Sequence, residues 1–111
     1  MSELNPEDAK IITLARSARA RTNAPEGAAV RDDTGRTYAA TSVDLPSLKI
    51  SALKLAVAMA VSSGAESLEA AAVVTQTETP PEADITTVRD LGPKAPILVA
   101  TPKGTLTKTI N

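Results

Sequence analysis

The side chains that could do chemistry in this 111-residue chain are carboxylates, amines, guanidinium groups, hydroxyls and one phenol. Lys54 could act as a nucleophile if burial lowered its pKa, and Asp44 could serve as a general base. Their spacing in the sequence does not pair them, and a lone lysine on a helix is usually solvated. A hydrolase or other enzyme built on these two residues is one functional hypothesis.

Histidine and cysteine are absent from the chain. Histidine is the side chain that titrates near neutral pH, and both residues are main ligands of zinc, copper and iron-sulfur centres. The composition therefore excludes a Ser-His-Asp or Cys-His nucleophile, a zinc finger and a disulfide. We expect no cofactor and no metal.

The composition and the length of the apolar runs argue against nucleic-acid and membrane partners. The net charge is −1, basic and acidic residues are interleaved, and Tyr38 is the single aromatic residue. These features predict no nucleic-acid partner. The longest apolar run, 55–61, is far shorter than a membrane span, so we expect no membrane partner and a cytoplasmic location.

The apolar residues are mostly alanine, valine, leucine and isoleucine. Small side chains contribute little burial energy each. We therefore expect self-association to supply part of the stability.

The first half of the chain predicts a helix, a hairpin and a second helix. Asn5 is the expected N-cap of a helix that begins at Pro6. Strands 28–30 and 36–41 are expected to pair around an Asp-Thr-Gly turn. The second helix is predicted from Ser47, its cap, to Ser63, with an apolar and fully buried middle. The first helix should bury Ile11, Leu14, Ala15 and Ala18.

The second half predicts strand 70–77, a helix opened by Pro81, and strands 97–100 and 105–110. Strands separated by helices imply parallel pairing within the sheet. We therefore predict that residues 1–111 form a single α/β domain with three α-β-α layers. Its mixed sheet should have about five strands, with helices on both faces.

The segments Asn-Ala-Pro-Glu-Gly-Ala-Ala-Val at 23–30 and Asp-Thr-Gly-Arg-Thr-Tyr at 33–38, followed by others in order, resemble motifs of the small cytidine deaminases. Residues 23–30 resemble the family's N-F-x-V-G-A-A-L segment, and residues 33–38 its D-G-x-x-Y hairpin. Residues 42–44 stand where the family has N-V-E, and residues 51–64 resemble C-A-E-R-x-A followed by A-V-x-x-G. Pro81 lies where the family's P-C-x-x-C helix begins. The resemblance covers most of the chain and implies the cytidine-deaminase-like fold.

The departures from the family pattern fall on the chemistry. In zinc deaminases, zinc held by Cys or His activates water while a glutamate shuttles protons. Ser51 stands at the first zinc ligand and Leu53 at the glutamate, and the other two ligands would fall near Glu82 and Ile85. Leucine carries no proton, and a serine hydroxyl is a poor zinc ligand. The resemblance thus implies the fold without the activity.

The substrate-binding positions also differ. Ala24 replaces the phenylalanine that forms a wall for the base, and Ser42 and Asp44 replace the Asn and Glu that bind ribose. Together with the four positions above, these residues define a vestigial pocket: Ala24, Ser42, Asp44, Ser51, Leu53, Glu82 and Ile85.

Two further hypotheses follow. The first is a pseudoenzyme that serves as a self-associating or partner-binding module, since fold and function separate readily. The family resemblance implies a homodimer or homotetramer. Binding of an unidentified protein partner is a further part of this hypothesis. The second is a sensor that binds a nucleoside-like or anionic small ligand at the helix N-terminus near residues 47–51. Its alternative is that Leu53 and Ile85 fill the pocket. The enzyme hypothesis includes a divergent cytidine deaminase.

Overall fold

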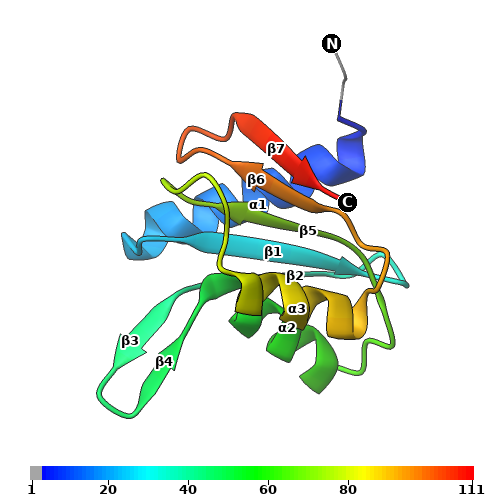
Figure 1. Cartoon of the computed structure of the whole chain (residues 1–111), viewed down its shortest axis with the longest axis horizontal. Coiled ribbons are helices and arrows are strands. Elements are labelled where there is room, and N and C mark those ends of the chain that lie inside the picture. The colour runs from blue at the N-terminus through cyan, green and yellow to red at the C-terminus, as the bar shows by residue number, and fades with distance from the viewer. Residues whose placement is uncertain (1–3) are drawn as a thin grey trace.

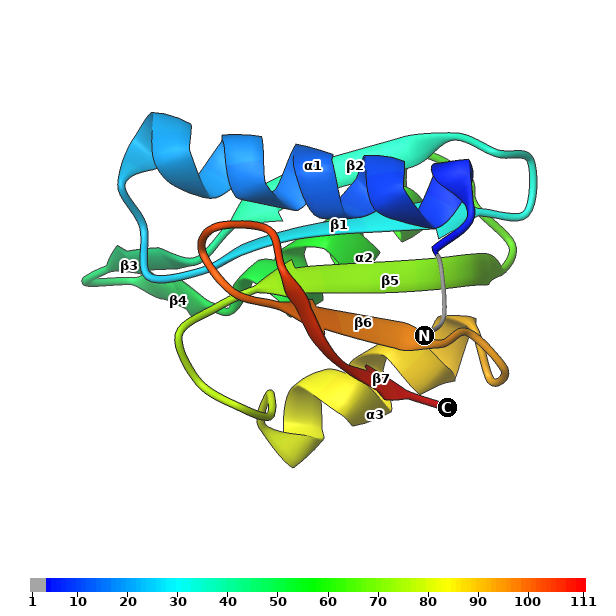
Figure 2. The same ribbon diagram turned by 90° about the horizontal axis from the view of Figure 1, so that it is seen from above.

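The computed structural model describes residues 4–111. It contains a five-stranded sheet, which is twisted and lies between helices (Figure 1). The strand order is β2-β1-β5-β6-β7; β5 and β6 are parallel and the other neighbours antiparallel. Helix α1 covers one face, and α2 and α3 lie on the other (Figure 2). The predicted three-layer fold with a mixed sheet is confirmed. The strands are β1 Gly27–Asp32, β2 Thr37–Thr41, β5 Leu68–Val74, β6 Ile97–Ala100 and β7 Leu106–Ile110, and the helices α1 Pro6–Thr22, α2 Ala52–Ser62 and α3 Glu82–Leu91.

Helix α1 begins where the sequence predicts. The Asn5 side chain accepts a hydrogen bond from the Asp8 backbone N–H at 2.8 Å, and Pro6 occupies the first turn. At the other end, Asn23 adopts a left-handed conformation with φ of 55°, which an asparagine tolerates well at a helix end. Leu14 is only partly buried, while its neighbour Ile12 is buried along with Ile11, Ala15 and Ala18.

Each face of the sheet carries its own apolar cluster because side chains alternate along a strand. On β1, Ala28 and Val30 pack toward α2 and α3, while Ala29 packs toward α1. Both clusters are rich in alanine, which lets the helices lie close to the sheet. No helix within residues 4–111 is long and apolar enough to cross a membrane.

The segment before α2 differs from the prediction. Residues 43–50 form a separate hairpin of β3 (Val43–Leu45) and β4 (Leu48–Ile50), in which Asp44 pairs with Lys49. The helix predicted from Ser47 begins instead at Ala52, and Ser51 is its N-cap. The prediction that the middle of this helix is buried all round is also wrong, because the side chains of Met59 and Val61 are 37% and 53% exposed.

Candidate functional site

Ser51 lies where α2 begins, and its hydroxyl is committed to two hydrogen bonds. Its Oγ accepts from the Lys54 backbone N–H at 3.2 Å and donates to Asp84 Oδ1 at 2.9 Å. The first bond caps the helix, since it satisfies one of the N–H groups that lack an intrahelical partner. The second joins the N-terminal turns of α2 and α3.

Asp84 is a residue of this site that the sequence prediction missed. It lies in the first turn of α3 and is only 4% exposed. A buried carboxylate needs hydrogen-bond partners, and Ser51 supplies one. A signal was available: Asp84 lies four residues before the apolar Val88, and residues four apart share one face of a helix.

Zinc deaminases have zinc ligands and a proton-shuttling glutamate at four positions. In this chain the same positions hold side chains of a different chemistry. Leu53 is fully buried in the cluster under α2 and α3, and Ile85 packs against the same cluster. Glu82 is exposed at the start of α3. Leu53 and Ile85 offer no donor atom, and the Ser51 hydroxyl donates to a carboxylate. Nor do residues 4–111 bring three or more His, Cys, Asp or Glu side chains together as metal ligands would require. The residues therefore do not fit a zinc ion.

Ser42 and Asp44, which stand at the family's ribose-binding positions, line a cavity of 310 Å³. Glu26 and Thr75, the residue that follows β5, line the same cavity. Ala24, Ser51, Leu53, Glu82 and Ile85 are not among its lining residues. Asp44 is exposed and forms a 2.6 Å ion pair with Lys49. Ser42 Oγ is buried without a hydrogen-bond partner among the described residues. The seven predicted positions thus do not form one pocket. Leu53 and Ile85 pack in the core, Ser42 and Asp44 line an open cavity, and Ala24 and Glu82 belong to neither group.

Glu26 is the second missed residue, and it brings a carboxylate to this cavity. It lies just before β1 and accepts a hydrogen bond from Thr75 Oγ1 at 3.3 Å. Burial raises the pKa of Glu26 above its usual value, the Thr75 hydrogen bond opposes that rise, and the negative charge of Asp84 adds to it. The cavity therefore holds an acid whose ionised form is disfavoured by the fold.

Replacing Glu26 with glutamine should stabilise the protein at neutral pH by about 0.5 to 1 kcal/mol. Because the folded-state pKa lies above the unfolded-state value, the wild-type protein loses stability from this group as the pH rises from 4.5 through the folded-state pKa. The gain of Glu26→Gln should thus be full at pH 7 and vanish at pH 4. Urea unfolding at both values measures it. Equal gains at both values, or a similar gain in the exposed control Glu66→Gln, would contradict this origin.

Comparisons with known proteins agree with this architecture. The model of the family described as "Cytidine deaminase-like" matches residues 4–104. The fold is similar to a crystal structure of cytidine deaminase from Burkholderia pseudomallei, with a TM-score of 0.80, 23% identity, and coverage of 92% of this chain and 90% of that one. It is also similar to cytidine deaminase from Mycobacterium leprae, with a TM-score of 0.72, 22% identity, and coverage of 95% and 93%. A search of curated protein sequences finds no match. At these identities the two structures support the fold alone, while the family model spans most of the sequence. The chain belongs to the cytidine deaminase-like family.

Proposed function

We propose that this protein is a catalytically inactive member of the family, a pseudoenzyme that works in the cytoplasm as a self-associating or partner-binding module. The observation that carries the proposal is the placement of its exposed large hydrophobic side chains. Within residues 4–111 there are four of them: Leu45 and Leu48 lie beside the tip of the β3–β4 hairpin, and Met59 and Val61 lie in the last turn of α2. We call these four residues the hairpin–helix surface.

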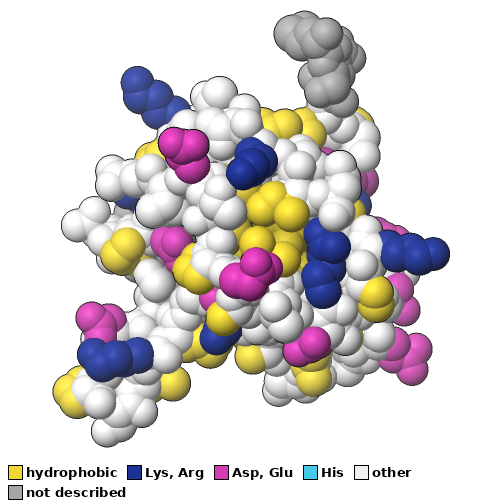
Figure 3. Space-filling view, viewed as in Figure 1, with side chains coloured by type: hydrophobic (Ala, Val, Ile, Leu, Met, Phe, Trp, Pro, Cys, Tyr) yellow, Lys and Arg dark blue, Asp and Glu magenta, His cyan; other side chains and the backbone are white. Residues whose placement is uncertain are grey.

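The shape of this surface favours a second copy of the chain as the partner. The hairpin stands out from the body with hydrophobic side chains at its end (Figure 3). A hairpin of two three-residue strands is marginal alone in water. At the end of helix α2 there is a hollow of 350 Å³, lined by Leu55, Ala58, Met59, Ser62 and Ser63. In a two-fold dimer the hairpin of each copy would reach the hollow of the other.

The charges of this region are also compatible with self-association. Helix α2 holds a single charged residue, Lys54, and the hairpin's Asp44 and Lys49 neutralise each other in an exposed ion pair. Depletion of charge is typical of the core of a protein interface. A homodimer would therefore bring few like charges together, and a homotetramer would need a second surface.

Replacing both Leu45 and Leu48 with serine should weaken dimerisation more than tenfold. Each leucine is about half exposed, so its burial in an interface contributes roughly 1 kcal/mol, twice per dimer. Sedimentation velocity across a dilution series measures the change, and Lys10→Ser, an exposed change on α1, is the matched control. A wild-type protein that stays monomeric at high concentration, or a double variant that associates as tightly as wild type, would count against self-association through this surface.

The inactive state has its own test. We expect the purified protein, supplied with zinc, to release no ammonia from cytidine, because Leu53 cannot carry a proton and the ligand positions do not fit zinc. A cytidine deaminase assayed alongside is the positive control. Turnover that a chelator abolishes would refute the pseudoenzyme proposal and favour a divergent deaminase.

The 310 Å³ cavity supports a second candidate function, a small-ligand sensor. Its specific observation is Ser42 Oγ, which is buried there without a hydrogen-bond partner among residues 4–111. The carboxylates of Glu26 and Asp44 favour an uncharged nucleoside-like ligand over the anion also considered. A thermal-shift series with nucleosides and nucleotides tests this, since a ligand that binds the folded state raises its apparent stability. A uniform lack of response would remove the sensor.

A further inference from the structure

A further cavity lies outside the vestigial metal position, at one end of the sheet. It has a volume of 710 Å³ and is formed between the β5–α3 connection and the β6–β7 turn. Both segments lie at the same end of the sheet in the two ribbon views (Figures 1 and 2). They follow the carboxyl ends of the parallel strands β5 and β6, which is where ligands commonly bind in sheets with parallel strands. A cavity of this volume is within the range that holds small molecules.

The walls of the cavity are held in place by hydrogen bonds between the segments. The Thr75 backbone N–H donates to the Ala100 carbonyl at 3.0 Å, which joins the ends of β5 and β6. Lys108 Nζ donates to Thr79 Oγ1 at 3.0 Å, and this bond ties β7 to the β5–α3 connection. The cavity is therefore built between anchored segments.

The lining is rich in threonine and contains a buried hydroxyl. Thr75 is 4% exposed, and its Oγ1 lies 3.2 Å from Thr77 Oγ1. Across the cavity, Thr101 Oγ1 accepts from the backbone N–H groups of Lys103 and Thr105, each at 3.3 Å. Because Thr101 Oγ1 is the acceptor in both bonds, the hydrogen of its hydroxyl remains free to be donated to a ligand. The threonine methyl groups supply apolar surface beside these hydroxyls.

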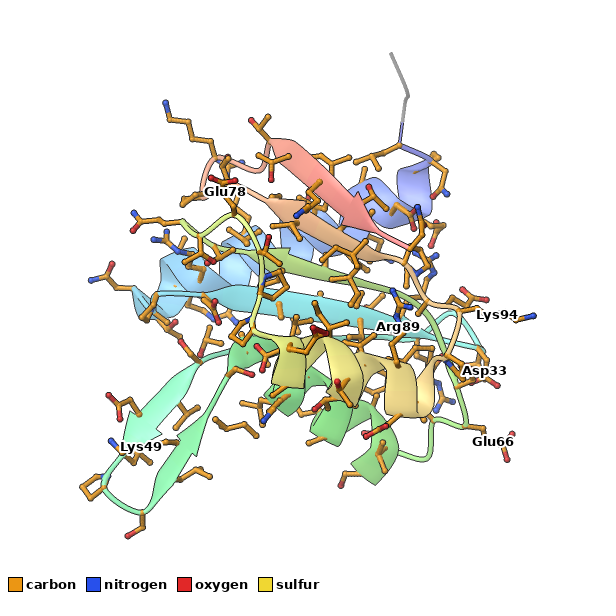
Figure 4. All side chains as sticks on the ribbon, in the orientation of Figure 1. Asp33, Lys49, Glu66, Glu78, Arg89 and Lys94 are labelled. Carbon is orange, nitrogen blue, oxygen red and sulfur yellow. The ribbon has the colours of Figure 1, made fainter. Side chains whose placement is uncertain are left out.

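Opposite charges line the two sides of the cavity. Lys103 lies on the β6–β7 turn. Glu78 lies on the β5–α3 connection (Figure 4). The ion pairs formed by residues 4–111 are Arg31–Asp8, Arg31–Glu69 and Lys49–Asp44, so neither Lys103 nor Glu78 is neutralised by an ion pair. The Lys103 ammonium and the Thr101 hydroxyl can both donate to a carboxylate of a ligand. On the other side of the cavity, the Glu78 carboxylate can accept from an ammonium of the ligand.

We propose that this cavity binds a small dipolar molecule that carries both a carboxylate and an ammonium, of the size of an amino acid or dipeptide. Lys103 and the Thr101 hydroxyl receive the carboxylate, and Glu78 receives the ammonium. The site is separate from the sensor candidate, which centres on Ser42 and Glu26, although the two cavities share residues 75–77.

The test is an NMR titration of ¹⁵N-labelled protein with L-alanyl-L-alanine and three capped forms of it. One form lacks the ammonium, one lacks the carboxylate, and one lacks both. The free dipeptide should give saturable shifts at the amides of Thr75, Thr77, Thr101 and Thr105. Each removed charge should weaken binding about two- to fivefold, as expected for an exposed ion pair.

Variants distinguish a site from surface charge. Lys103→Met should weaken binding only of the forms that have a carboxylate, and Glu78→Gln only of those that have an ammonium. The matched controls Lys94→Met and Glu66→Gln change exposed charges that do not line the cavity (Figure 4). Ser42→Ala, which alters only the smaller cavity, should leave dipeptide binding unchanged. No saturable shift, equal affinity for the doubly capped form, or identical behaviour of Lys103→Met and Lys94→Met would overturn the proposal.

Discussion

Replacing Gly27 with alanine should destabilise the protein by about 3 kcal/mol, which is the upper end of the usual cost of overpacking. A Cβ at this position would lie 2.1 Å from the carbonyl oxygen of Ala15 and 2.9 Å from the Cβ of Arg19. Both atoms belong to α1, and the first is backbone, so no side-chain rotation relieves the contact. The helix would have to move away from β1, and the alanine-rich cluster between them would lose contacts.

Urea unfolding at pH 7 measures this cost, and Gly64→Ala is the matched control. Gly64 follows α2 with φ of +100°, and a Cβ there meets nothing within 4 Å. Its replacement should cost only the roughly 1 to 2 kcal/mol of a left-handed alanine. The comparison separates crowding from backbone conformation. If Gly27→Ala were as stable as wild type, or no worse than Gly64→Ala, close contact between α1 and β1 would not be what requires glycine.

The sequence predicts α1, the β1–β2 pair, α3 and β6 well because their signals are local. Asn5 and Pro6 mark a helix start, and the Asp-Thr-Gly turn sets the hairpin. The start of α2 could not be predicted in the same way. Ser47 and Ser51 are equally good N-caps, and each precedes apolar residues. The hydrogen bond from Ser51 to Asp84 joins residues 33 positions apart, so the choice between the two serines depends on tertiary structure.

The candidate site was predicted in part for a similar reason. The family resemblance implies that Ser42 and Asp44 belong to one pocket, and both residues line the 310 Å³ cavity. The carboxylates of Glu26 and Asp84 have no counterpart in the family motifs and were therefore overlooked. Burial is the main cause of the raised pKa of Glu26, and the charge of Asp84 adds to it. No spacing rule reveals this coupling, because Glu26 precedes β1 and Asp84 lies on α3.

Replacing Asp32 with alanine should cost about 3 kcal/mol at pH 7, mainly through lost hydrogen bonds to a buried carboxylate. Asp32 is 2% exposed. Its Oδ1 accepts from the backbone N–H groups of Thr34 at 2.9 Å and Arg36 at 3.0 Å, and from the Thr34 hydroxyl at 2.7 Å. Its Oδ2 accepts from the Tyr38 hydroxyl at 2.9 Å. Alanine would leave these donors without their partner and would loosen the turn between β1 and β2.

The same residue predicts a pH dependence. Burial tends to raise the pKa of Asp32, but the hydrogen bonds from Thr34, Tyr38 and Arg36 outweigh burial and lower the pKa to about 2. Because this value lies below the unfolded-state pKa of 3.8, the stabilisation is full above that value and is lost as the pH falls toward 2. The cost of Asp32→Ala should therefore be largest at neutral pH and shrink steadily below pH 4. Urea unfolding from pH 7 to pH 2 measures the cost, with the exposed neighbour Asp33→Ala as control. A cost that does not change with pH would show that the charge of Asp32 contributes nothing and that only its shape is needed at the turn.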